Sequence, residues 1–469
     1  MKLLFNKPLL YCLLLLQLPA ALMAQQVQVK PDFPNMRRYD QQGINVFEDP
    51  KDTAAVFDGL KLKFGAGFTQ QFQNLKHKNP DALNNDAGSF SNGESKAGNK
   101  LKVITAGFQT AQANLYMDVQ LADGIRLNVT TYLSSKHHNE AWVKGGFIQF
   151  DRLPFKGQVW DNIMKVTTIK VGHFEVNYGD EHFRRSDGGH TLYNPFMEGY
   201  IMDAYATEIG GEIYVKKNGL FGMIGVTNGM IKGNVDSLYA AANPDGKLHK
   251  SPSLLLKAGF DKMVTSNVRM RLSASYYGNQ SSGSNTLYGG DRSGSNYQYV
   301  MELNSANPSS STGAGTPLAF SGRLNPGFTK KINAFMFNGF VKTRGLELFG
   351  TYETASGRNA RETAARNANQ YAVDVIYRFF KAENLFVGVR YNNVHAQLAN
   401  NAAGTGAGPV NYTGKVNVDR LALGAGWFLT RNVLLKGEYV IQQYKHFPVA
   451  DYRAGGRFDG YVIEASVGF

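Results

Sequence analysis

Residues 111–121, AQANLYMDVQL, alternate strictly between apolar and polar or amphipathic side chains. A β-strand points successive side chains to opposite faces of its sheet, so this alternation predicts a strand with one apolar and one polar face. The same alternation returns over residues 125–134, directly after Ala122-Asp123-Gly124. We therefore expect an antiparallel hairpin at this point of the chain.

One register of this hairpin satisfies both its turn and its two faces. A three-residue loop with Gly124 in the left-handed conformation pairs Leu121 with Ile125. Val119 then lies opposite Leu127, and Met117 opposite Val129. Every apolar residue faces an apolar partner in this arrangement, which predicts this register.

The alternation recurs along the whole chain and predicts sixteen strands. They lie near residues 60–73, 101–121, 125–135, 141–152, 166–177, 205–217, 219–228, 253–261, 267–278, 332–342, 345–354, 370–380, 385–395, 416–428, 432–445 and 458–469. Mostly tight turns follow the even-numbered strands, and mostly long loops follow the odd-numbered ones. Segregated loop lengths and an even strand count are typical of outer-membrane barrels. We predict an all-β, transmembrane antiparallel β-barrel of about 16 strands, with short periplasmic turns and long extracellular loops.

Two connections do not fit this alternation of lengths. Residues 136–140 are short for the rim with the long loops, and residues 153–165 are long for the rim with the tight turns. The strands beside them, at 141–152 and 166–177, are the least regular in sequence.

The N-terminus has the layout of a processing segment. Residues 1–24 combine Lys2 and Lys7 with a short apolar stretch that ends in small residues, as in a secretory signal peptide. Cys12, the only cysteine, lies within this segment, so the mature chain must be stabilised without disulfides. The chain has a formal net charge of +13, but it shows no clustered run of Lys and Arg, and with the secretory route this argues against a nucleic-acid partner.

The mature chain divides into two parts. Residues 25–58 are polar and contain three prolines, so we predict a periplasmic N-terminal extension that is either disordered or packed against the barrel mouth. Residues 59–469 form the predicted outer-membrane barrel.

Three stretches of the chain resemble a known family. They are residues 37–77, the segment VGHFEVNYGDEHFRRSDGGHTLYNPF at 171–196, and the C-terminal strand GYVIEASVGF. These are similar to a porin family of Gram-negative, Bacteroidota-type outer membranes, distantly like phosphate-selective porins. The resemblance implies a porin-type channel in the cell outer membrane, with a homotrimer as one form of assembly. It also implies that Phe469 is an assembly signal read by the barrel-assembly machinery.

The resemblance does not carry over a substrate, because a phosphate-selective channel is expected to show a dense arginine ladder. Strand parity instead predicts a lumen wall with nearly balanced charge. The expected lumen-facing basic residues are Lys61, Lys63, Arg126, Lys257, Arg269, Arg271, Lys342, Arg378, Arg390, Arg420 and Lys436. The expected acidic ones are Asp118, Glu208, Glu212, Asp261, Glu347, Glu353, Asp374, Glu438 and Glu464. Arg269, Arg271 and Lys257 form a local basic cluster. It is either a position where permeating anions bind or a structural cluster.

Residues 178–204 follow the fifth predicted strand and lie on the rim with the long loops. In large barrels a loop near this position often folds inward and narrows the channel. We expect its two arginines to pair with acidic residues of the same loop while presenting charge to water. The arginines are Arg184 and Arg185, and the expected partners are Asp180, Glu181 and Asp187. The candidates for pore constriction and selectivity are Arg184, Arg185, Asp187, His182, Arg269, Arg271 and Lys257.

A metal-binding or catalytic site fits this loop poorly. His173, His182 and His190 form no H-E-x-x-H or comparable arrangement. Ser186 has His182 and Asp187 close in sequence, but a catalytic triad needs rigid support that a loop of this kind does not show. We expect no metal, no cofactor and no enzymatic activity.

Three functions remain open at this stage. The first is a water-filled porin for passive diffusion of small hydrophilic solutes, with a mild anion preference. The second is a substrate-selective phosphate or anion channel. The third is a non-transport barrel, either an adhesin or an outer-membrane enzyme. A barrel of about 16 strands is wide enough to leave an aqueous channel, which favours the first function. The expected partners are outer-membrane lipid, the assembly machinery and small hydrophilic solutes or anions.

Overall fold

A computed structural model describes residues 36–51, 57, 59–80, 101–133, 142–230, 249–291, 293–303, 321–401 and 409–469. The predicted signal peptide at 1–24 and the short connection at 136–140 lie outside the described residues.

The described strands form one antiparallel sheet that closes on itself. They are β1 (Lys61–Lys78), β2 (Gly107–Phe108), β3 (Gln112–Ala122), β4 (Ile125–Leu133), β5 (Trp142–Phe150), β6 (Thr167–Glu175), β7 (Thr207–Lys217), β8 (Leu220–Thr227), β9 (Ser253–Thr265), β10 (Val268–Asn279), β11 (Lys331–Thr343), β12 (Leu346–Arg358), β13 (Arg366–Phe379), β14 (Leu385–Ala396), β15 (Val416–Thr430), β16 (Val433–Lys445) and β17 (Arg457–Gly468). β2 is a two-residue strand that precedes β3 beside β1. The other sixteen strands make the barrel and confirm the predicted architecture.

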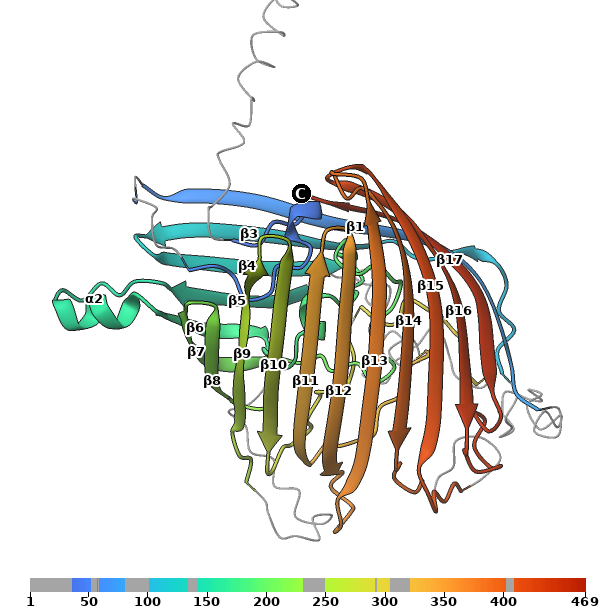
Figure 1. Cartoon of the computed structure of the whole chain (residues 1–469). Helices are drawn as coiled ribbons and strands as arrows, with labels where there is room; N and C mark the ends of the chain where they lie inside the picture. The colour runs from blue at the N-terminus through green and yellow to red at the C-terminus, as the bar shows by residue number, and fades with distance from the viewer. Residues whose placement is uncertain are drawn as a thin grey trace, which may run out of the picture.

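Each barrel strand pairs with its neighbour in sequence, and β17 returns to pair with β1. Figure 1 shows β9–β16 across the near wall, with β1 and β3–β5 crossing behind them at a wide angle, as tilted strands do in a closed barrel. The tight turns gather at one rim (the turn rim) and the long connections at the other (the loop rim). No helix in the described part of the chain is both long enough and apolar enough to cross a membrane.

Side chains alternate between the two faces of each strand, with polar side chains inside the barrel and apolar side chains outside. In β13, Val373 and Val375 are exposed on the outer face, whereas Asp374 and Arg378 are buried within. The charged residues that strand parity places in the lumen are all buried or half-buried, as predicted. A closed sheet with an apolar outer face and a polar interior is the arrangement that lipid requires.

The first hairpin confirms most of the predicted register and corrects its end. Val119 lies opposite Leu127, and Gly124 has a left-handed φ of 67°. The predicted pair of Leu121 with Ile125 is wrong, because Ala122 faces Ile125 instead. The chain turns on Asp123 and Gly124 alone, so within the paired span β3 has one residue more than β4, and this residue, Leu121, forms a bulge.

Segments from both rims fill much of the barrel interior. Residues 36–51 enter at the turn rim, where Gln41 N donates to Arg431 O at 2.9 Å. Residues 176–206, 280–291, 293–303 and 321–330 enter from the loop rim, and most of their side chains are buried. The described part of the N-terminal extension therefore packs at the barrel mouth.

The last residue takes part in closing the barrel. Phe469 N donates to Ala66 O at 3.0 Å, and Ala66 N donates to Phe469 O at 2.9 Å, while the Phe469 ring is 58% exposed. Backbone and ring can therefore be tested separately.

We predict that deleting Phe469 lowers the yield of folded barrel, because both seam hydrogen bonds are lost with it. Phe469→Ala keeps those backbone bonds and removes only the ring. If the ring is the assembly signal, this variant lowers yield as much as the deletion does. The measurement is the amount of heat-modifiable protein in the membrane fraction on SDS gels. Normal yield for both variants would contradict any role of Phe469 in assembly.

Candidate functional site

The loop that the sequence predicts to fold inward does lie inside the barrel, but its two arginines do not pair with the predicted acidic residues. Arg184 is 1% exposed and donates a hydrogen bond to Asn45 Oδ1 of the N-terminal segment. Its Nη1 lies 3.8 Å from Glu347 Oε2 on β12, and its guanidinium lies 4.8 Å from the ring centroid of Phe349. Arg184 thus ties the loop to the N-terminal segment and to the wall.

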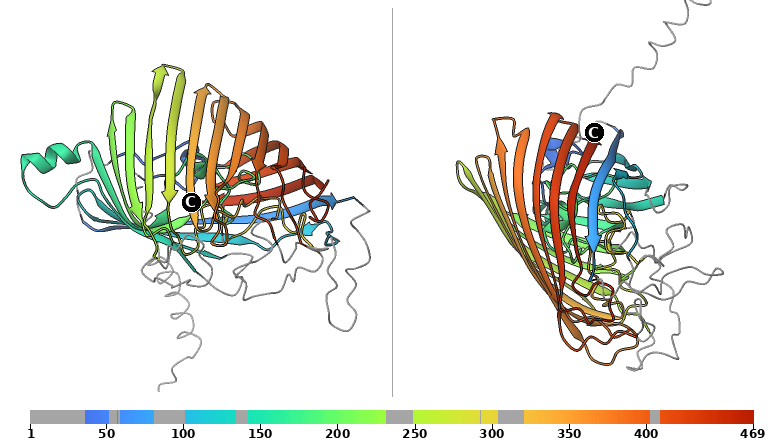
Figure 2. Two further views of the ribbon diagram at one scale, coloured as in Figure 1. Left: turned by 90° about the horizontal axis from the view of Figure 1, so that it is seen from below. Right: turned by 90° about the vertical axis from the view of Figure 1, so that its right-hand side faces the viewer.

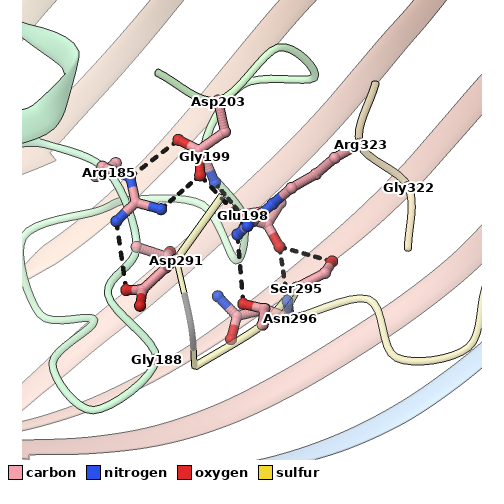
Figure 3. Close-up of polar contacts among 12 residues, drawn as sticks. Arg185, Gly188, Glu198, Gly199, Asp203, Asp291, Ser295, Asn296, Gly322 and Arg323 are labelled. Atoms are coloured by element: carbon pink, nitrogen blue, oxygen red, sulfur yellow. Dashed lines mark hydrogen bonds and ion pairs between the residues drawn. The ribbon is translucent and has the colours of Figure 1, made fainter. Parts of the chain in front are cut away.

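Arg185 belongs to a second group of charges, which joins three inward segments (Figure 3). Its Nε and Nη2 donate to the two carboxylate oxygens of Asp203, at 2.9 and 2.5 Å, and its Nη1 lies 3.6 Å from Asp291 Oδ2. Asp203 also lies 3.4 Å from Arg323 Nη1, whose Nη2 contacts Glu198 Oε1 at 2.5 Å. These pairs fasten residues 280–303 and 321–330 to the loop.

The predicted partners Asp180, Glu181 and Asp187 are therefore wrong, although Arg185 does pair within the loop, with Asp203. Asp180 contacts Lys257 and Arg271, each at 2.8 Å, and Asp187 contacts Lys144 Nζ at 2.5 Å. Glu181 lies 4.0 Å from Arg390, and neither of its carboxylate oxygens has a hydrogen-bond partner in the described part of the chain. Burial raises the pKa of Glu181 to about 8, so the folded protein holds this group protonated at neutral pH.

The predicted basic cluster is neutralised by carboxylates. Besides Asp180, Glu48 of the N-terminal segment contacts Lys257 Nζ at 3.1 Å and Arg271 Nη1 at 2.8 Å. Arg269 Nη2 contacts Asp261 Oδ2 at 2.6 Å. Of the two interpretations of this cluster, the geometry favours the structural one.

A cavity of about 330 Å³ lies between the inward segments and the wall made by β3–β7. On β5 its lining runs from Lys144, near the loop rim, to Gln149, near the turn rim, and on β7 from Thr207 to Lys216. Nine residues of strand span roughly 30 Å, so the cavity follows the wall over most of the barrel height. Gly145 and Gly146 line it as well.

Three lysines on the cavity wall were not among the predicted site residues. They are Lys144 on β5, Lys170 on β6 and Lys216 on β7. Lys170 lies 4.5 and 4.2 Å from the ring centroids of Phe147 and Phe174 and 3.8 Å from Glu212. Lys216 donates to the backbone oxygen of Asp49 at 2.6 Å. Lys216 lies an even number of residues from Glu208 and Glu212 on the same strand, so its side chain must point into the lumen as theirs do. Lys216 could therefore have been predicted from the sequence.

Among the seven predicted site residues, His182, Arg185 and Asp187 line the cavity. The cavity lining does not include Arg184, Lys257, Arg269 or Arg271. The structure therefore brings together only part of the predicted set around open space.

Two cavity-lining histidines are held neutral. His182 Nε2 donates to Asn177 Oδ1 at 2.9 Å, and burial lowers its pKa well below the usual range. His190 Nε2 donates to Tyr39 O at 2.7 Å, and burial lowers the pKa of His190 to about 4. Within the described ranges, no group of three or more His, Cys, Asp or Glu side chains is arranged to hold a metal ion.

Comparisons with known proteins give structural likenesses alone. No protein-family model matches the chain, and no curated protein matches it. An anion-selective porin from Comamonas acidovorans is 11% identical with a TM-score of 0.49, over 88% of this chain and 100% of that one. The outer membrane channel DcaP of Acinetobacter baumannii is 11% identical with a TM-score of 0.44, over 88% and 98%. OmpT of Vibrio cholerae is 10% identical with a TM-score of 0.45, over 88% and 99%. None of these likenesses identifies a family, a solute or an assembly for this chain.

His190 gives the site a defined dependence on pH. Its pKa is about 4 in the folded protein and near 6.5 once unfolding exposes it to water, so only the unfolded chain takes up the proton between these values. Acidification from pH 6.5 to 4 therefore removes up to about 3 kcal/mol of stability. We predict that His190→Gln flattens this part of the pH profile. The measurement is detergent-solubilised unfolding of both proteins from pH 7 to pH 4; parallel profiles would contradict the prediction.

Proposed function

We propose that this protein is an outer-membrane porin that admits small hydrophilic solutes by passive diffusion. The observation that carries the proposal is the cavity beside β3–β7, whose lining extends from residues near the loop rim to residues near the turn rim. The route is narrow, because inward segments occupy much of the remaining lumen. Charged side chains such as Arg185 and Lys216 line it among aromatic rings such as Phe147. The charged groups can bind solutes that carry their own hydrogen-bonding groups.

A mild anion preference follows from how the cavity charges are paired. Lys216 donates to a backbone oxygen, and Arg37 donates to the backbone oxygens of Gly43 and Phe183 at 2.9 and 2.7 Å. The positive charges of Lys216 and Arg37 are therefore neutralised less than that of Lys144, which contacts two carboxylates, Asp187 and Asp291. Charge on the wall of a low-dielectric channel biases permeation towards ions of opposite sign.

The phosphate-selective alternative has less support. It relied on Arg184, Arg185, Arg269 and Arg271, and each of these guanidinium groups lies within 4 Å of a carboxylate. In the proposed channel, Arg185 and Asp187 narrow the route near the loop rim, and His182 narrows it deeper inside, beside Asn177.

A non-transport barrel remains the second candidate because the lumen is so full. An adhesin or outer-membrane enzyme would use the loop rim and would need no continuous route. Single-channel recording separates the two, since a barrel closed along its whole length gives no current steps.

The location and partners belong to the same proposal. The exposed apolar outer faces of the strands support contact with outer-membrane lipid, with the turn rim in the periplasm and the loop rim outside. Secretion by a signal peptide at 1–24, recognition by the barrel-assembly machinery and assembly as a homotrimer stay predictions.

Lys216 allows a matched test of selectivity. Lys216 faces the cavity and its neighbour Lys217 is exposed on the opposite face, so both substitutions to Gln remove one positive charge at the same strand end. We predict that Lys216→Gln shifts the reversal potential in a salt gradient towards cations, while Lys217→Gln leaves it nearly unchanged. The shift should be largest at low salt, because the Debye length is about 10 Å at 0.1 M and about 3 Å at 1 M. Equal shifts in both variants would place the route elsewhere.

A further inference from the structure

A short helix stands where a tight turn is expected. α2 (Gln158–Met164) connects β5 to β6 at the turn rim. Figure 1 shows it extending sideways from the ends of these strands, and Figure 2 shows it clear of the barrel when seen from below. The long connection at 153–165, which breaks the pattern of loop lengths, is thus an element projecting from the barrel.

The sequence of α2 is amphipathic. Successive residues of an α-helix are rotated by about 100°, which sorts this helix into two continuous sides. The apolar side consists of Val159, Trp160, Ile163 and Met164. The polar side consists of Gln158, Asp161, Asn162 and the following Lys165.

Most of the apolar side does not pack against the protein. Met164 is buried, but Val159 is 70% exposed, Ile163 45% and Trp160 43%. Phe155, 56% exposed, adds its ring at 5.5 Å from that of Trp160. We call Phe155, Val159, Trp160 and Ile163 the apolar ridge. A ridge of this size points to a non-aqueous surrounding.

The ridge is continuous with the outer surface of the barrel. Phe150 of β5 pairs with Ile169 of β6 next to α2, and the next outward pair, Ile148 with Val171, is exposed. These outward side chains belong to the apolar face that lipid covers. The same surface therefore runs from the barrel wall onto the helix.

Residues beside the ridge suit the border between lipid and water. Lys156 and Lys165 are both exposed and flank the ridge at its two ends, where each can meet a lipid phosphate. A tryptophan ring is at its most favourable at the level of the lipid headgroups.

We propose that α2 lies in the headgroup region of the lipid leaflet at the turn rim, with the apolar ridge among the first carbons of the acyl chains. Lys156 and Lys165 then contact lipid phosphates from the water side. The helix fixes the depth and rotation of the β3–β7 side of the barrel in the membrane. This proposal depends on the barrel fold and not on the proposed transport activity.

The test uses a single spin label on each side of the helix. A chain refolded without residues 1–24 lacks Cys12, the only cysteine, so Val159→Cys and the control Asn162→Cys each carry one reactive thiol. Both proteins are labelled with a nitroxide in phosphatidylethanolamine–phosphatidylglycerol vesicles. Collision rates are measured with oxygen, which concentrates in lipid, and with a nickel chelate, which stays in water. We expect the oxygen-to-nickel ratio to be several-fold higher at position 159 than at 162.

Equal ratios at the two positions would overturn the proposal, because the ridge would then lie in water. Dipolar broadening at position 159 that disappears on dilution with unlabelled protein would overturn it in favour of contact with a second copy. Heat-modifiable mobility verifies that each variant is folded. If either fails to refold, Ile163→Cys and Asp161→Cys provide the same comparison on the same two sides.

Discussion

A charge taken out of water must be paired, and the interior of this barrel follows from that requirement. Side chains alternate between the two faces of each strand, and the polar and charged ones point into the barrel. Segments from both rims then displace much of the water around them. A buried ion without a partner costs several kcal/mol, so each buried charge on the wall or on an inward segment needs an oppositely charged partner. The pairs Arg184–Glu347 and Arg271–Asp180 do this across the lumen, and Glu48 extends the pairing to the N-terminal segment.

This pairing also decides where open space remains. Arginines held by carboxylates fasten the inward segments, and two of them, Arg184 and Arg271, are not part of the cavity lining. On the β3–β7 side the wall carries glycines, and two of the cations there, Lys170 and Lys216, contact aromatic rings or a backbone oxygen. Arg185 and Lys144 belong to both groups, because they line the cavity and are also held by carboxylates.

The sequence was informative wherever the determining interaction was local. Alternation predicted all sixteen strands and the inward direction of Asp374 and Arg390, because side-chain direction depends only on the strand itself. It missed the bulge at Leu121, which depends on how the turn closes. It also missed the partners of Arg184 and Arg185, since Glu347 and Asp203 become neighbours only after the loop has folded inward. A sequence read on its own favours the nearest acidic residues as partners.

In the proposed channel, solutes pass beside β3–β7 and not through the middle of the lumen. Single-channel recording with thiol modification tests it, using Thr130→Cys on the cavity wall and Ser275→Cys, buried on the inner face of β10. We expect current steps in both variants, and a charged thiol reagent should reduce the current through Thr130→Cys alone. Reduction through Ser275→Cys with Thr130→Cys unaffected, or the absence of any current steps, would contradict it.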